Sequence, residues 1–127
     1  MRTLAVALLI AQAAGVLAWW AVMLVYPGAR EPFKATGAPD STLFGYLPAD
    51  LIFYVAGALL AAYGLARREP WGWPVLCVVA GACAYAALYG WGIVLLGGGA
   101  VLGALFMTPT MVALPVVAWL LRPGAGT

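Results

Sequence analysis

The chain has 127 residues, of which 66% are hydrophobic and 8% are charged. An ordinary soluble domain carries roughly 25% charged residues, so this composition excludes a soluble fold and predicts an integral membrane protein. The net charge of +2 comes from scattered basic residues, which excludes a nucleic-acid partner, and the absence of histidine removes the commonest general base and metal ligand.

The first apolar run covers residues 4–26 and ends at Pro27, where a helix cannot easily continue. A membrane-spanning helix needs about 20 apolar residues, and this run is long enough. The rival interpretation is a secretory signal peptide, because residues 11–13 resemble a small-x-small cleavage site. Apolar sequence continues to Val25, well past that site, so we predict a transmembrane helix.

A polar segment over residues 27–47 is the long connection of the predicted fold. It holds Arg30, Glu31, Lys34 and Asp40, and Asp50 follows shortly after it. Two interpretations are open. The charges form a rim that holds a lipid head group, or the segment is a solvated loop and Asp50 caps the free N–H groups of the next helix.

Three further apolar runs follow, separated by short connections. Two arginines and a proline close the second run, and three glycines between the third and fourth runs predict a tight reversal. The predicted spans cover residues 48–66, 74–96 and 100–121. Residues 1–127 are therefore expected to form one domain, an all-α bundle of four transmembrane helices.

Pro109 and Pro115 lie inside the fourth span and deprive the carbonyl groups four residues earlier of their helical hydrogen bonds. Three donors are open for the freed carbonyls: the hydroxyl groups of Thr108 and Thr110, water, or the polar head of a bound ligand. The helix should be kinked. The kink serves packing alone, or it marks a ligand pocket or a hinge.

Two tyrosines, Tyr85 and Tyr89, lie four residues apart on the third span. They predict a slot for a flat apolar ring or hydrogen bonds to other helices, and Gln12 in the first span is expected to bond to another helix. Small residues at spacing four fit either packing within the bundle or a homo-oligomer interface. They include Ala7, Ala11 and Gly15 in the first span and Ala58 and Ala62 in the second.

The basic residues predict the orientation of the bundle, because those in short loops favour the cytoplasmic side. Four of them lie on the side shared by both termini, and two lie in the long connection. We therefore expect cytoplasmic termini, an outward-facing segment 27–47 and a multi-pass protein of the cell membrane. The six residues are Arg2, Arg67, Arg68 and Arg122 on one side and Arg30 and Lys34 on the other.

Several chemical classes lack the residues they need. No Asp, Glu, Lys or Arg lies in the middle of a predicted span, which disfavours a proton-coupled pump. Cys77 and Cys83 are about 9 Å apart along one predicted helix, too far for a disulfide, so both are expected to be free thiols. We expect neither a metal nor a cofactor, and we assign no catalytic residue.

The leading functional hypothesis is a small non-catalytic membrane protein that binds a lipid-like or apolar ligand within the bundle, or an accessory subunit of a membrane complex. The alternatives are an enzyme acting on a lipid-borne substrate, with Glu31, Asp40 or Asp50 as acid or base, and a small-solute transporter or oligomeric pore. Expected partners are membrane lipids, an apolar small molecule, and further copies or a larger complex. The candidate ligand-binding residues are Arg30, Glu31, Lys34, Asp50, Tyr85, Tyr89, Thr108 and Thr110.

Overall fold

The computed structural model describes residues 1–124 of the chain, and their regular structure is helical. Four helical segments are long and apolar enough to cross a membrane, which confirms the all-α class and the number of membrane-length helices. The C-terminal residues 125–127, which we predicted to be cytoplasmic, lie outside the described residues. The four segments are Arg2–Val25, Asp40–Arg67, Gly72–Gly97 and Val101–Leu120.

Three of these segments are single helices, and the second is composite. The single helices are α1 (Arg2–Val25), α5 (Gly72–Gly97) and α6 (Val101–Leu120), the last of which contains both prolines. The second segment joins four elements, which are α2 (Asp40–Phe44), α3 (Leu47–Ala49), the π-helical η3 (Asp50–Gly57) and α4 (Ala58–Arg67).

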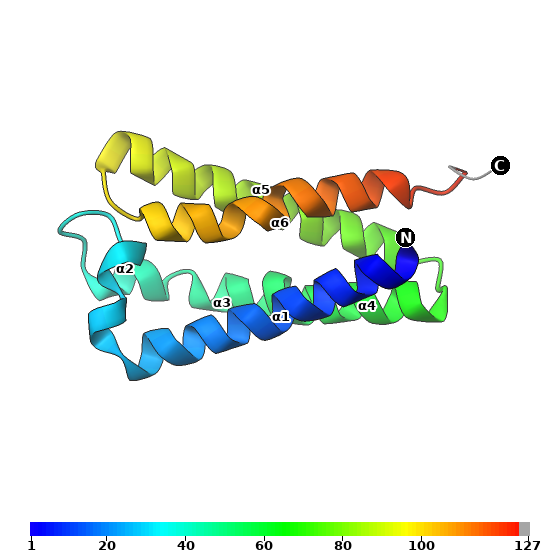
Figure 1. Cartoon of the computed structure of the whole chain (residues 1–127), viewed down its shortest axis with the longest axis horizontal. Helices are drawn as coiled ribbons and strands as arrows, with labels where there is room; N and C mark the ends of the chain where they lie inside the picture. Colours follow the sequence, from blue (N-terminus) through cyan, green and yellow to red (C-terminus); the bar gives the residue numbers. More distant parts are fainter. Residues whose placement is uncertain (125–127) are drawn as a thin grey trace.

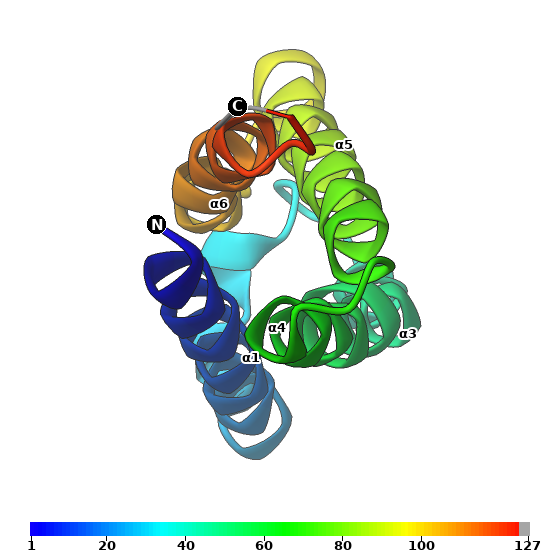
Figure 2. The ribbon, with the colours of Figure 1, turned by 90° about the vertical axis from the view of Figure 1, so that its right-hand side faces the viewer.

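The helices form an open ring in cross-section, as the end-on view in Figure 2 shows. In this ring α1 packs against η3 and α4, α4 packs against α5, and α5 packs against α6 in a hairpin. Direct packing between α1 and α6 is minor by comparison. The bundle is therefore closed on three sides by helix contacts and is weakly joined on the fourth.

Small side chains allow the closest helix contacts. Ala5 of α1 and both Ala58 and Ala61 of α4 are completely buried, together with larger residues such as Leu9 and Leu76. These side chains belong to one core that joins the four membrane-length segments. Removing such side chains from contact with solvent or lipid and packing them densely holds the helices in place.

The stripes of small residues have different surroundings in different helices. Ala58 and Ala62 of α4 are buried within the bundle. Ala7, Ala11 and Gly15 of α1 are instead exposed on its surface. Internal packing therefore explains the stripe on α4 but not the stripe on α1.

Residues 27–39, called the capping segment below, close one end of the bundle (Figure 1). They contain the short 3-10 helices η1 (Pro27–Ala29) and η2 (Glu31–Phe33). The segment then pairs with the turn between α5 and α6. The Thr36 N–H donates to the Gly98 carbonyl at 3.1 Å, and the Ala100 N–H donates to the Lys34 carbonyl at 2.8 Å. The glycine turn thus anchors the cap as well as reversing the chain.

The second helical segment begins at Asp40, whereas the sequence pattern places the start of the second span at residue 48. Pro48 lies in the first turn of α3, where a proline leaves no helical N–H unsatisfied, so the chain continues through it without a break. This earlier start places Asp50 inside a long helical segment instead of at its N-terminus.

Candidate functional site

The carboxylate of Asp50 is buried inside the bundle, and only 7% of the residue is exposed. Its backbone N–H donates to the Tyr46 carbonyl at 2.9 Å, which continues the helix through this position. Its side chain accepts a hydrogen bond from the indole Nε1 of Trp20 at 2.9 Å. The expectation that Asp50 caps a helix N-terminus is therefore wrong, because the free N–H groups of that terminus lie ten residues earlier.

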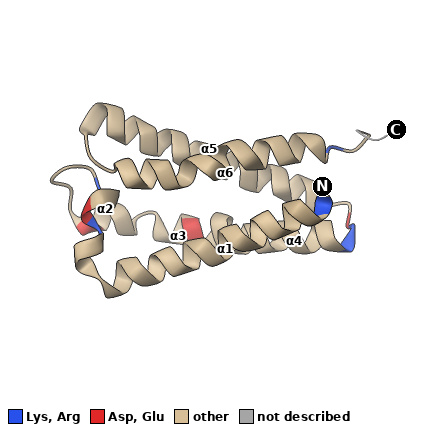
Figure 3. Ribbon diagram, viewed as in Figure 1, with Lys and Arg blue, Asp and Glu red and all other residues tan. Residues whose placement is uncertain are grey.

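This placement also corrects the expectation that no Asp, Glu, Lys or Arg lies in the middle of a span, because Asp50 is well inside a membrane-length segment. Asp50 is the first residue of η3 in the segment Asp40–Arg67. Figure 3 shows charged residues gathered at the two ends of the molecule, with an acidic segment beside α3 that is separate from both groups. Ionisable residues inside such segments are costly to keep and usually have a functional role.

Two cavities meet at Asp50. The first, called the outer cavity, has a volume of about 480 Å³ and lies beneath the capping segment, bounded by α5 and α6. The second, called the lateral cavity, has a volume of about 440 Å³ and lies between α1, η3 and α6. Both cavities are mostly apolar. The residues that line both are Trp19, Phe33, Asp50, Gly103 and Met107.

The lateral cavity reaches the outer surface of the bundle where α1 and α6 are weakly packed. Of its lining residues on α6, Leu105 is 47% exposed and Phe106 is 61% exposed. On the α1 side, a Cβ atom added to Gly15 would meet no atom within 4 Å. Gly15 and these α6 residues therefore lie at an exposed edge of the lateral cavity, whose lining also includes Asp50.

A second group of polar side chains adjoins the lateral cavity, which Gln12 and Tyr54 line. Gln12 donates from Nε2 to the Tyr54 carbonyl at 3.4 Å, and the Tyr54 hydroxyl donates to the Cys83 carbonyl at 3.4 Å. The Cys83 thiol donates to Oε1 of Gln12 at 3.9 Å. Gln12 thus bonds to another helix as expected. These contacts satisfy one another and join α1, η3 and α5.

Trp19 is the other notable polar residue of the cavity walls. Its indole Nε1 is buried and has no hydrogen-bond partner within residues 1–124. Its ring contacts Trp20 and Phe33 edge-on, with centroid distances of 4.7 and 5.1 Å. A buried donor without a partner lowers the stability of the fold by about 1–3 kcal/mol. Stability alone therefore does not explain the presence of Trp19 in the cavity wall.

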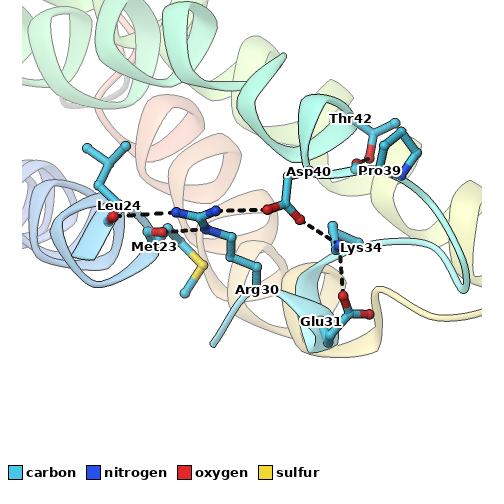
Figure 4. A network of polar contacts seen from close by, with 8 residues as sticks. All are labelled: Met23, Leu24, Arg30, Glu31, Lys34, Pro39, Asp40 and Thr42. Atoms are coloured by element: carbon cyan, nitrogen blue, oxygen red, sulfur yellow. Dashed lines mark hydrogen bonds and ion pairs between the residues drawn. The ribbon is translucent and has the colours of Figure 1, made fainter. Parts of the chain in front are cut away.

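The predicted charged rim is present, but its charges neutralise one another (Figure 4). Asp40 pairs with Arg30 at 2.8 Å and with Lys34 at 2.6 Å, and Lys34 also pairs with Glu31 at 2.8 Å. The hydrogen bonds that the Lys34 ammonium donates to Asp40 and Glu31 raise the pKa of Lys34 above its ordinary value. The structure therefore brings together Arg30, Glu31 and Lys34 around Asp40, whereas Asp50 belongs to the interior.

The two tyrosines predicted to form a slot differ in their surroundings. Tyr85 is 73% exposed and lines neither cavity. Tyr89 is 53% exposed, lines the outer cavity and contacts the ring of Tyr46 with a centroid distance of 6.1 Å. The pair does not form a shared slot, but Tyr89 belongs to the wall of the outer cavity.

The threonine hydroxyls do not donate to the carbonyl groups freed by the prolines, so that alternative for the donor is wrong. Thr108 donates to the Ala104 carbonyl at 2.8 Å, and Thr110 donates to the Met107 carbonyl at 3.0 Å. A threonine hydroxyl in a helix reaches a carbonyl three or four residues before its own position, and this geometry decides the acceptor. Thr110 lines the lateral cavity, and Thr108 accepts a hydrogen bond from Trp91 at 3.0 Å.

Comparison of the chain with protein families, curated proteins and solved structures gives no match. Within residues 1–124, no three His, Cys, Asp or Glu side chains gather into a metal-binding group. The function must therefore be inferred from the two cavities and the carboxylate between them.

Sequence reasoning did not select several residues of this site. Trp19, Trp20 and Phe33 appear in the sequence as ordinary apolar residues, yet they surround Asp50 or donate to it. Trp20 and Asp50 are 30 positions apart, so no helical periodicity connects them. The available signals were a carboxylate at the start of the second apolar run and two adjacent tryptophans in the first run.

Proposed function

We propose that the protein binds an amphiphilic, lipid-like molecule inside its helical bundle and does not alter it chemically. One observation carries this proposal: two mostly apolar cavities share a buried carboxylate at the place where they meet. Their volumes of about 480 and 440 Å³ lie within the range of small-molecule sites, roughly 300–1,000 Å³. An apolar chain with one polar group matches this distribution of surfaces.

The opening between α1 and α6 supports lateral entry of the ligand from the lipid phase. In a bilayer this side of the bundle would face hydrocarbon chains, so an amphiphile would reach the cavity without crossing water. The capping segment covers the opposite approach from the end of the bundle. We propose further that the cap faces outward and the termini face the cytoplasm of a cell-membrane protein, as the distribution of basic residues indicates.

The proposed entry route is tested by enlarging one small residue at the opening. In Gly15→Leu the new side chain fills open space between α1 and α6, so the fold should be kept while entry is blocked. Gly81→Leu is the matched control, because Gly81 also faces open space but lies on α5, away from both cavities.

Native mass spectrometry of gently extracted protein measures the bound amphiphile directly. Wild type and Gly81→Leu are expected to retain a bound molecule of lipid-like mass, and Gly15→Leu is expected to lose most of it. A ligand-free wild-type protein, or equal retention in both variants, would contradict the proposed site and entry route.

Transport of a small solute is a second candidate, because an ionisable residue inside a membrane-length segment is a feature of many transport pathways. A lack of solute flux into liposomes that contain the protein would remove it. The enzyme hypothesis has less support. Glu31 and Asp40 are held in ion pairs, and within residues 1–124 neither contacts the carboxylate of Asp50.

A further inference from the structure

Among residues 1–124, no cation pairs with the carboxylate of Asp50. The hydrogen bond that the structure shows to its carboxylate, among residues 1–124, comes from the neutral indole of Trp20. A carboxylate removed from water costs several kcal/mol unless a cation or several hydrogen bonds compensate it. The negative charge of Asp50 is therefore not compensated by the described part of the protein, and a bound cation can compensate it.

Lys34 is the cation that could be expected to pair with Asp50, because both residues line the outer cavity. Its ammonium group is already bound between two other carboxylates, Asp40 at 2.6 Å and Glu31 at 2.8 Å. Arg30 is bound in turn to Asp40 and to the carbonyl of Met23. Arg30 and Lys34 thus balance the charges of Glu31 and Asp40, and the charge of Asp50 is left without a partner among residues 1–124.

Aromatic residues line the two cavities that meet at Asp50. Trp19 and Phe33 line both cavities, Tyr46 lines the outer cavity, and Tyr54 lines the lateral cavity. The electron-rich faces of such rings attract organic cations, most strongly where water is excluded. A carboxylate among aromatic rings is a chemical environment suited to an ammonium group.

We propose that the polar group of the ligand is a protonated amine that pairs with Asp50, while its apolar chain occupies the lateral cavity. This inference rests on the proposed function and narrows its ligand to alkylammonium amphiphiles. An anionic head group would face an unpaired carboxylate at short range, which is repulsive. A neutral head group would leave the charge of Asp50 without compensation.

Three probes with the same twelve-carbon chain separate these cases: dodecylammonium, dodecanol and dodecanoate. Each is titrated into protein held in nanodiscs of uncharged lipid, and binding is followed by tryptophan fluorescence, since two tryptophans adjoin the site. Wild type should bind dodecylammonium more tightly than dodecanol and should bind dodecanoate most weakly. The expected margin over dodecanol is about tenfold or more, as for other hydrogen bonds to charged groups.

The decisive variant is Asp50→Asn, which keeps an oxygen to accept the Trp20 N–H but removes the charge. It should bind dodecylammonium about tenfold or more weakly than wild type and should bind dodecanol as wild type does. Glu69→Gln is the matched control, because it removes one negative charge at an exposed position between α4 and α5. It should leave the affinities for all three probes unchanged.

Equal affinity of Asp50→Asn and wild type for dodecylammonium would overturn the inference, as would a wild-type preference for dodecanol or dodecanoate. If no dodecyl compound bound to wild type, the proposed function itself would fail. If dodecanol bound but the charged head group gave no advantage, only the ammonium assignment would fail. Should Asp50→Asn not fold, the order of the three affinities in wild type alone decides.

Discussion

At the scale of single residues, two polar side chains in the interior of the bundle lack, among residues 1–124, the partners that would normally stabilise them. Asp50 accepts one hydrogen bond from Trp20, and the buried N–H of Trp19 has no partner within the described residues. Both features reduce stability in the absence of a ligand. Natural proteins keep such features mainly where they serve binding or catalysis, which is consistent with a ligand site between the two cavities.

Gly99 is the residue on which closure of the cap depends most directly. Its φ of +78° is unfavourable for other residues, and an added Cβ would lie 2.6 Å from the Thr36 nitrogen. Gly99→Ala should therefore lower the free energy of unfolding by about 2–4 kcal/mol. Gly97→Ala is the control, because Gly97 is helical and has open space around it. Equal thermal unfolding temperatures for the two variants, measured by circular dichroism, would show that the cap is not anchored there.

At the scale of elements, the composite second segment sets the geometry of the site. The π-helical stretch η3 begins at Asp50 itself and carries Tyr54 one turn later. Wider helical turns of this kind are rare in proteins as a whole, and those that occur are often found at functional sites. Together with the early helix start at Asp40, this stretch places the carboxylate between α1 and α6 and beneath the capping segment.

The capping segment should loosen at alkaline pH. Its ion pairs raise the pKa of Lys34, so their contribution is fully present below the ordinary value of 10.5 and is lost as the pH rises through the higher folded-state value. Wild-type protein should therefore lose thermal stability between about pH 10 and 12. Lys34→Met has no ammonium group to titrate at this position, so its unfolding temperature should fall less over the same pH interval. Ionisation of tyrosines affects both proteins and does not account for a difference between them. Parallel curves of unfolding temperature against pH would rule out this role for Lys34.

At the scale of the whole molecule, the unequal closure of the ring decides how the cavities can be reached. The helix hairpin α5–α6 and the pair formed by α1 with α4 pack firmly, but α1 and α6 meet weakly. The lateral cavity opens at this join, and its exposed wall includes Leu105 and Phe106. The chain is thus arranged as a bundle with one side open, which suits a ligand that arrives from the surrounding lipid.

The proposed sidedness of the bundle is tested by labelling one added cysteine at a time with a membrane-impermeant maleimide, with wild type as the background because it already carries Cys77 and Cys83. Gly28→Cys places a thiol at an exposed position of the cap that has open space around it. It should react in intact cells, whereas Thr127→Cys at the C-terminus should react only after the membrane is permeabilised. Reaction of both from the outside would show that the predicted orientation, with four crossings and cytoplasmic termini, is wrong.

Much of the architecture follows from the sequence alone, because hydrocarbon requires long apolar helices and these are visible as runs of apolar residues. Residues 4–26 and the other three runs are therefore recognised without a structure. The charged residues of the cap are also recognisable, since they interrupt the apolar pattern between Pro27 and Asp40.

Only the tertiary structure decided where Asp50 lies and what surrounds it. A proline followed by a carboxylate is a common helix start, so local sequence favoured a cap, while the actual start depended on how residues 40–47 pack. The Trp20–Asp50 hydrogen bond and the weak join between α1 and α6 involve residues far apart in the chain. Helical periodicity reports the faces of single helices and carries no information about which faces meet.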